Sequence, residues 1–369
     1  MATLIFKATE KCNSNCAYCD VIHKEQKIAS MPLEMLELIF IRIDEFLKAR
    51  PEEDFNVTWH GGEPLLLGPD YFLKAWELQE KRCPETKSRI SHQLQSNFTL
   101  FTKEFIEPFT RLGISQLGSS FDPEPHMRGP GPEIDSEWYN RRFMKATGLA
   151  ARHGFSWGMI YVVTRKSLAR AREIFFFLTN LQLSGGVNFN PVLIYDETRQ
   201  HLAVTPEEFS DFLGELLPLW WEHQTRYPIV QPFHGLKQNL RKGGRSLGCV
   251  DSGECAYHHV NISPAGAASH CGRSSDWGLL KYGNIQDRSL EDILRDEQRE
   301  QLLARNEILL RTECEGCRFW TICHGGCPLD AWWKHHSFAH KSEWCEAKRG
   351  FIERYFEPIS GLKFEPYEQ

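Results

Sequence analysis

Cysteine is the residue type of this chain that most clearly points to chemistry. The 369 residues include twelve cysteines, and they are unevenly placed. Cys12, Cys16 and Cys19 stand near the start, eight more fall in the last third, and Cys83 stands alone. In a chain without a secretion signal, cysteines at short fixed spacings are more often metal ligands or catalytic groups than disulfide partners. The pattern therefore predicts metal chemistry in two regions.

The first cysteine loop reads Cys12-Asn-Ser-Asn-Cys16-Ala-Tyr-Cys19 and follows directly on an expected strand. Three thiolates can hold three irons of a four-iron cluster and leave the fourth iron open. An open coordination position is what a reactive metal site needs. A zinc loop, or three unrelated thiols, is the alternative that the spacing alone leaves open.

Polar residues also mark the ends of three expected strands. Gly61-Gly62-Glu63-Pro64 ends the second strand, where glycines allow close backbone approach and a carboxylate can accept hydrogen bonds from a cation. Gln95-Ser96-Asn97 ends the third strand, and Ser120-Phe121-Asp122, followed by Arg128, ends the fourth. Helix capping is the alternative role for these Ser and Asp residues.

Strands and helices alternate through the first half of the chain. Six strand-then-helix units predict a parallel sheet with right-handed crossovers, arranged as a partial (β/α)6 barrel whose chemistry gathers at the carboxyl ends of the strands. The expected strands are 4–8, 55–59, 90–95, 114–121, 155–163 and 187–191. The expected helices are 32–48, 69–80, 102–111, 137–153, 168–181 and 206–223.

Composition separates a second region from this α/β part. From about residue 231 glycine and cysteine become frequent and apolar periodicity fades, as in segments that are held by metal rather than by a large core. We expect domains at 1–230 and 231–350, and a C-terminal tail at 351–369. The net charge of −6 provides no basic surface for nucleic acid. No signal peptide or membrane span is evident, which predicts a cytoplasmic protein without a membrane partner.

These motifs together resemble those of the radical S-adenosylmethionine (SAM) superfamily. The resemblance implies that the first cysteine loop holds a cluster whose open iron binds the methionine part of SAM. It places Tyr18 near the adenine and the GGEP element at the methionine ammonium. The cofactor contacts that we expect from it are Tyr18, Gly61, Gly62, Glu63, Ser96, Ser120, Arg128 and Asn190.

The last third resembles the SPASM domain, the auxiliary-cluster module of peptide-modifying radical enzymes. Eight thiolates fill two four-iron clusters completely, so the expected cofactors are three [4Fe–4S] clusters and SAM. A zinc ribbon remains the alternative for the part from Cys314 to Cys327. By resemblance to sulfatase-maturing relatives, the cluster nearer the substrate is held by Cys249, Cys255, Cys271 and Cys327. The outer cluster is held by Cys314, Cys317, Cys323 and Cys345.

The resemblance leaves three functions open. The first is a maturase that cross-links a ribosomally made peptide, and the second is an anaerobic sulfatase-maturing enzyme that forms formylglycine. Relatives of the second kind place an Asp directly after the third near-cluster cysteine, where this chain has Gly272. The third is a non-catalytic electron-transfer protein. Candidate bases are Asp122, Asp276 and Glu254. Expected partners are a precursor peptide or protein and a reductant such as flavodoxin or ferredoxin, and we expect no leader-recognition domain before the barrel.

Overall fold

The structure is a computed structural model that describes residues 2–19, 30–181, 183–241 and 247–364. The chain forms two compact units, and each unit is built from two separate stretches of sequence. The first unit contains Met1–Gly158 and Tyr257–Arg299, and the second contains Met159–Ala256 and Glu300–Gln369. The domain limits predicted from the sequence, at residues 230 and 350, remain a prediction, because the division into compact units follows contacts rather than stretches of sequence.

The first unit is built on a mostly parallel sheet with the strand order β10-β9-β8-β1-β2-β3-β4. Strands β1 to β4 and β8 run parallel, whereas β9 and β10 pair antiparallel. Six of the eight residues of β1 are buried, in keeping with its mostly apolar sequence. The strands are β1 (Ala2–Thr9), β2 (Phe55–Gly61), β3 (Ile90–Gln95), β4 (Gln116–Ser120), β8 (His259–Ile262), β9 (Ala267–Ser269) and β10 (Lys281–Asn284).

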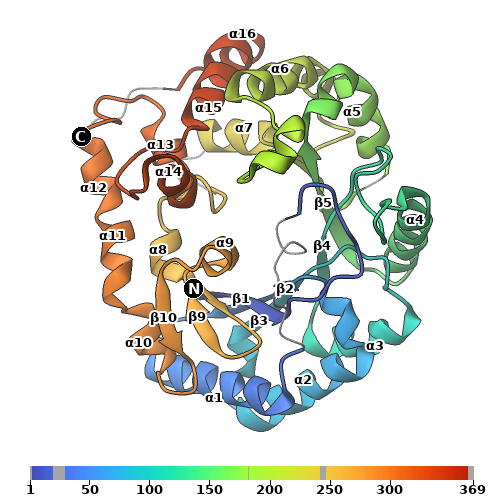
Figure 1. The fold of residues 1–369 in the computed structure, drawn as a ribbon, viewed down its shortest axis with the longest axis vertical. Helices are drawn as coiled ribbons and strands as arrows, with labels where there is room; N and C mark the ends of the chain where they lie inside the picture. Colours follow the sequence, from blue (N-terminus) through green and yellow to red (C-terminus); the bar gives the residue numbers. More distant parts are fainter. Residues whose placement is uncertain (1, 20–29, 182, 242–246, 365–369) are drawn as a thin grey trace. The chain divides into compact units, whose positions relative to one another are not determined.

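Helices α1, α2 and α3 lie side by side along one face of these strands (Figure 1). Their apolar stripes bury aromatic side chains against the sheet, where the Trp59 ring lies 4.7 Å from that of Phe6 and 5.0 Å from that of Phe72. Asp135 caps α4 by accepting a hydrogen bond from the Trp138 N–H. The helices are α1 (Leu33–Ala49), α2 (Pro69–Arg82), α3 (Ile106–Leu112), α4 (Ser136–Arg152), α9 (Gly272–Asp276) and α10 (Leu290–Leu294).

The second unit contains three parallel strands in the order β5-β6-β7 and most of the cysteine-rich region. β5 (Ser156–Val163) begins in the first unit and ends in the second, and it precedes β6 (Val187–Pro191) and β7 (Val230–Gln231). α6 (Pro206–His223) starts at the capping box that Thr205 forms with Glu208. Thr205 is therefore the N-cap of this helix.

Short helices follow one another through the rest of the second unit. α15 packs against α6, and a π-helix at Ile352–Phe356 continues that packing. The helices are α5 (Ala171–Thr179), α7 (Phe233–Arg241), α11 (Glu300–Leu303), α12 (Arg305–Leu310), α13 (Trp320–Cys323), α14 (Pro328–His335), α15 (Cys345–Phe351) and α16 (Glu357–Ser360). α8 (Cys255–His258) crosses the boundary between the units.

Sequence and structure agree on every expected strand and helix to within a few residues, apart from two helix starts. Residues 165–170 form a 3-10 helix that Thr164 and Ser167 close with a capping box, so α5 begins at Ala171 rather than at 168. Likewise, a 3-10 turn at Lys103–Phe105 precedes α3. The predicted α/β class with a parallel sheet is confirmed.

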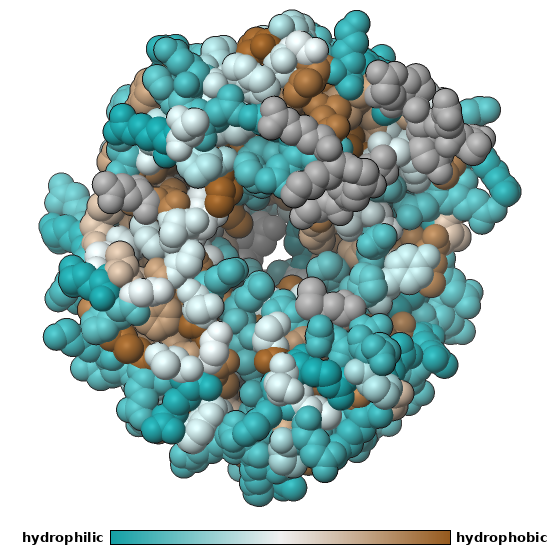
Figure 2. Space-filling model, turned by 180° about the vertical axis from the view of Figure 1, so that it is seen from behind, coloured by the Kyte–Doolittle hydropathy of each residue, from teal (hydrophilic) through white to brown (hydrophobic). Residues whose placement is uncertain are grey.

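The surface view in Figure 2 shows a predominantly hydrophilic face with small hydrophobic groups scattered over it. The large apolar side chains that are exposed include Met144 on α4 and Phe177 on α5. None of the helices within the described residues is long and apolar enough to cross a membrane.

Candidate functional site

The first cysteine loop leaves β1 and is held by backbone hydrogen bonds to the segment around residue 128. The Asn15 N–H donates to Gly129 O at 2.6 Å, and the Ala17 N–H donates to Met127 O at 3.0 Å. Cys12, Cys16 and Cys19 are all free thiols. Burial raises the pKa of Cys12 to about 12 and that of Cys16 to about 11. Such thiols stay protonated in the bare protein, and binding iron displaces the protons.

Arg128 provides a buried positive charge beside this loop. Its Nη1 lies 3.9 Å from Cys16 Sγ, and its Nε donates to the carboxylate of Asp122. Tyr18 hydrogen-bonds both Arg128 and Asp122, and the guanidinium lies 5.4 Å from the centre of the Tyr18 ring. The structure therefore brings together three of the residues predicted from the sequence. Asp122 is committed to this ion pair rather than open to a substrate.

Gly61 and Gly62 bring the end of β2 against the chain that leads into the cysteine loop. A Cβ on Gly61 would lie 2.1 Å from Thr9 O, and one on Gly62 would lie 2.1 Å from Lys11 O. Gly61 also has φ of +127°, which side chains disfavour. The Gly62 N–H donates to Thr9 O, and the Glu63 N–H donates to Lys11 O. Only glycine fits here, because two backbones meet without room for a side chain.

The Glu63 carboxylate is fully buried and accepts three hydrogen bonds from the protein. The Leu65 N–H and the Ser96 hydroxyl each donate to Oε1 at 2.8 Å, and the Asn97 N–H donates to Oε2 at 2.7 Å. Burial raises the pKa of Glu63 to about 7, although these three bonds lower it. Ser96 thus orients Glu63, and Glu63 ties the end of β2 to the end of β3.

Asn97 is a contact that the sequence analysis placed in a motif but did not select as a site residue. Its Nδ2 donates to Asn13 Oδ1 at 2.8 Å and lies 4.0 Å from Cys12 Sγ. Asn13 in turn donates to Thr99 Oγ1 at 2.8 Å. Asn97 therefore connects the end of β3 to the cysteine loop. Its place two residues after the end of the predicted strand 90–95 was the signal that could have selected it.

This part of the first unit fits a four-iron cluster with SAM. It offers three free thiols on one loop, a guanidinium beside them, and a backbone strip of glycines ending at a buried carboxylate. Thiolate donors suit iron–sulfur clusters, and a cation beside thiolates offsets their charge. A carboxylate held by three donors is rigidly placed for orienting a charged ligand.

A second polar cluster lies on β1, β2 and α9 of the first unit. The Lys7 ammonium is buried and forms an ion pair with Asp276 at 2.5 Å, and it also donates to Gly272 O at 3.3 Å. His60, which pairs with Lys7 across the two strands, has its pKa lowered to about 4 by burial and by the Lys7 charge. Sequence analysis missed Lys7, although a lysine inside an apolar strand was a usable signal.

The outer cysteine set gathers within the second unit. The charges of Cys323, Cys345 and Cys317, after burial, raise the pKa of Cys314 to about 12, so the four thiols lie close enough to interact. Cys314 also packs with Leu309 and Trp320 in a small apolar cluster. Among the residues that the structure describes, no three His, Cys, Asp or Glu side chains converge on a single metal position. A four-iron cluster does not need such convergence, because its ligands bind different irons.

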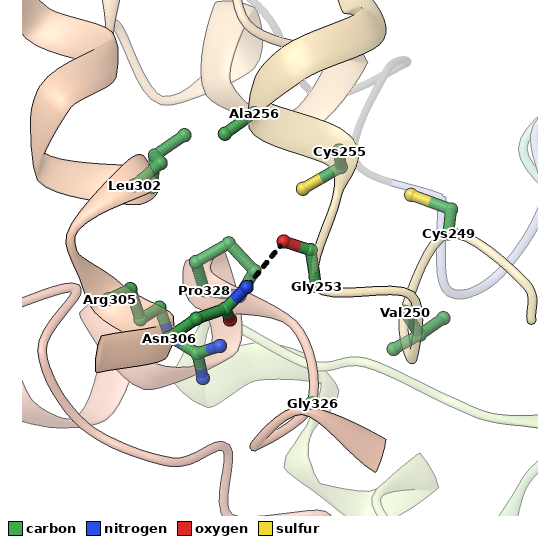
Figure 3. A pocket seen from close by; sticks show the side chains of 10 residues that line it. All are labelled: Cys249, Val250, Gly253, Cys255, Ala256, Leu302, Arg305, Asn306, Gly326 and Pro328. Carbon is green, nitrogen blue, oxygen red and sulfur yellow. Dashed lines mark hydrogen bonds between the residues drawn. The ribbon is translucent and has the colours of Figure 1, made fainter. Parts of the chain in front are cut away.

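Three of the four cysteines predicted for the nearer cluster also lie in the second unit. Cys249 and Cys255 line a pocket with Arg305, and Gly326 and Pro328, which flank Cys327 in sequence, line the same pocket (Figure 3). Cys271 belongs to the first unit, where it precedes α9. The pocket is thus lined from the chain segments that carry Cys249, Cys255 and Cys327.

The remaining predicted residues have diverse environments. Ser120 ends β4, and its hydroxyl accepts a 3.4 Å hydrogen bond from Gln95 Nε2. Asn190 lies in β6 of the second unit and pairs with Val162 of β5. Glu254 is exposed and precedes Cys255. Cys83 is fully buried and donates to Phe40 O at 3.3 Å, as expected of an ordinary thiol.

Comparison with known sequences identifies two modules. Residues 6–178 match the radical SAM superfamily, and residues 249–318 match SPASM, an iron–sulfur cluster-binding domain. The chain is 24% identical over 345 residues to the serine-type anaerobic sulfatase-maturating enzyme of Bacteroides thetaiotaomicron, which covers 86% of this chain and 80% of the relative.

Solved structures of two proteins share the fold. Native anSMEcpe with bound AdoMet superposes with a TM-score of 0.82 at 22% identity, over 97% of this chain and 98% of that one. Streptococcus suis SuiB bound to the precursor peptide SuiA gives 0.62 at 15% identity, over 93% and 75%. The matches confirm the predicted modules, and the predicted iron–sulfur clusters and SAM are the cofactors of these families.

Proposed function

Because the chain belongs to the radical SAM superfamily and carries a SPASM domain, we propose that it modifies a ribosomally made peptide by forming a cross-link within it. The bond joins an unactivated side-chain carbon to another carbon, an oxygen or a sulfur of the same peptide. The proposal draws support from relatives of both kinds, since SuiB was solved with a precursor peptide and the sulfatase-maturating enzymes act on protein substrates.

With its cluster and SAM bound, the first unit supplies a 5′-deoxyadenosyl radical. The residues of the chain bind and orient. Cys12, Cys16 and Cys19 would hold the cluster, and the Gly61–Gly62 backbone with Glu63 would orient the methionine ammonium. Arg128 would offset negative charge beside Cys16. In the cross-linking reaction the peptide loses one hydrogen atom to the radical, one proton, and one electron. We assign the electron to the auxiliary clusters at the eight cysteines of the last third.

The environment of Gly272 is the observation that carries the choice of reaction. Formylglycine formation needs a base at the oxidised carbon's hydroxyl or thiol, and Gly272 has no side chain to accept that proton. The carboxylate that lies next to this position is Asp276, and it is paired with Lys7 at 2.5 Å. A carboxylate held in a buried ion pair would have to leave its partner to act as this base.

Formylglycine formation is the second candidate, and a specific observation favours it. Lys7 contacts both Asp276 and the carbonyl of Gly272, so the Asp276 carboxylate stands one helical turn from the residue where relatives place their base. If Lys7 moved away on substrate binding, Asp276 could accept a proton. The electron-transfer alternative lacks such support, because the SAM-binding elements are complete.

The test uses full-length protein, reduced anaerobically and supplied with SAM and two synthetic peptides. One is a small peptide taken from the open reading frames next to the gene, and the other is a sulfatase motif containing Ser or Cys. Cross-linking predicts a precursor product lighter by two hydrogens, with fragmentation suppressed between the joined residues. A hydrazine-reactive aldehyde on the sulfatase peptide, lost in Asp276→Asn, would establish the second candidate instead.

A further inference from the structure

Arg305 is a buried cation at the start of α12, with only 3% of its surface exposed. Its guanidinium donates to four backbone carbonyls, and within the described residues it forms no ion pair with a carboxylate. A buried charge that lacks a counter-charge is strongly unfavourable, so something else must balance it. The acceptors, at 2.8 to 2.9 Å, are the carbonyls of Phe338, His324, Gly325 and His340.

Cysteines from both auxiliary sets lie close enough to this guanidinium for their charges to act on it. Burial lowers the pKa of Arg305, and the charges of Cys327, Cys255, Cys314 and Cys323 act against that effect. The first two belong to the set predicted for the nearer cluster, and the last two belong to the outer set. Arg305 also lines the pocket that contains Cys249 and Cys255 (Figure 3). Thiolate-ligated clusters at these cysteines would supply the counter-charge.

Arg305 also fixes the short loop Cys323-His-Gly-Gly-Cys327, which carries one predicted ligand of each cluster. His324, Gly325 and Gly326 have φ of 48°, 73° and 72°, three left-handed residues in succession. The His324 and Gly325 carbonyls accept hydrogen bonds from Arg305, so this guanidinium holds the loop between Cys323 and Cys327 in place.

We propose that Arg305 is a positioning residue shared by the two auxiliary clusters. It holds the loop that joins their ligands, and its charge stabilises the reduced state of both. The physical reason is that each one-electron reduction adds one negative charge to a cluster, and a fixed cation nearby lowers the energy of that charge. The inference rests on the proposed assignment of the eight cysteines to two clusters.

The experiment measures reduction potentials in full-length protein. A triple variant with Cys12, Cys16 and Cys19 replaced by Ala serves as the background protein, because it lacks the signal of the cluster in the first cysteine loop. Arg305→Gln and Arg305→Lys are each introduced into this background protein. Iron is counted, and each protein is titrated with dithionite while electron paramagnetic resonance follows the reduced clusters. Arg89→Gln is the matched control, because Arg89 also donates to four backbone carbonyls but lies in the first unit.

We expect Arg305→Gln to shift both potentials to more negative values, Arg305→Lys to shift both by less, and Arg89→Gln to shift neither. Unchanged potentials in Arg305→Gln, or a shift of one cluster alone, overturn the proposal. If Arg305→Gln binds less iron than the background protein, the potentials of Arg305→Lys provide the test instead. Unchanged potentials in Arg305→Lys then overturn the proposal. A background protein with no auxiliary signal overturns the cluster assignment itself, and this inference with it.

Discussion

The two cysteine regions of this molecule are built in opposite ways. The loop from Cys12 to Cys19 is positioned by the sheet, since it follows a buried strand and is held by the segments that follow neighbouring parallel strands. The outer set, by contrast, is carried by short helices and turns such as α13 and the left-handed loop after it. A sheet can position ligands without metal, whereas short helices with a small core depend on it.

This difference indicates different roles for the two cysteine regions. On the proposed ligand assignment, three ligands on a rigid base would leave an iron open for a cofactor. Arg128 and Asn97 lie beside this loop, and Glu63 is bound to Asn97. Four ligands on weak local structure would close a cluster completely and would gain structure from it. The first region is therefore expected to lose activity when its ligands are removed, and the second to lose its fold.

Iron removal should have the largest effect, and it should separate the regions. Anaerobically purified protein should carry about twelve irons, from three four-iron clusters. After chelation we expect backbone amides from α12 to α15 to lose hydrogen-exchange protection, because short helices without their cluster are marginal. Amides of β1 to β3 should stay protected, because their core does not use iron. Equal loss of protection in both regions would contradict the comparison.

Replacing Cys12, Cys16 and Cys19 by Ala should remove about four irons of about twelve and leave the fold intact. Cleavage of SAM to 5′-deoxyadenosine under strong reductant should disappear, because no iron remains to bind the cofactor. Chromatography of the reaction mixture measures the product. Cys83→Ala is the matched control, and it should keep both iron and cleavage. Cleavage surviving in the triple variant would show that the reactive cluster lies elsewhere.

Glu63→Ala should weaken SAM binding by about 1.5–3 kcal/mol, or roughly ten- to hundred-fold in Kd. The reason is that Ser96 and Asn97 fix this carboxylate at the end of β2, where our proposal has it orient the methionine ammonium of SAM. Titration calorimetry with SAM measures the change. Glu63→Gln keeps the acceptor oxygen but loses the charge, and we expect an intermediate affinity. An unaltered Kd in both variants would remove Glu63 from the site.

The smallest effect concerns acid stability of the iron-independent core. His92 accepts a hydrogen bond from Trp59 Nε1 and bonds Gln79, and burial lowers its pKa to about 3. The unfolded value is about 6.5, so its contribution is complete above that pH and is lost as the pH falls towards 3. The opening free energy of the β2 and β3 amides, obtained from exchange rates corrected for the intrinsic pH dependence, should therefore fall by on the order of a few kcal/mol over this interval.

His92→Gln provides the matched variant for this prediction, because an amide keeps a donor and an acceptor and does not titrate in this range. The opening free energy of its β2 and β3 amides should depend less on pH between 6.5 and 4. If wild type and variant respond in parallel, another group controls the acid stability of the first unit.

Local patterns explain how much the sequence could predict. The cysteine loop and the GGEP element lie within a few residues of one another, and their strands alternate with amphipathic helices, so spacing alone locates them. Lys7 could not be assigned a partner, because Asp276 lies 269 residues away in the chain. Arg305 could not be selected either, since it lies in a charged stretch of sequence. Its hydrogen-bond acceptors are backbone carbonyls, which every residue has.

The pairing of β1 with β8 has a consequence for how the protein is made. Thr3 to Phe6 align with His259 to Ile262, so one edge of β1 has no partner until most of the chain has left the ribosome. The nascent chain thus carries an unpaired, apolar strand next to a reactive cysteine loop during most of its synthesis. Slow translation or late iron delivery would extend that exposure. We therefore expect chaperone capacity and iron supply during expression to govern the yield of soluble protein.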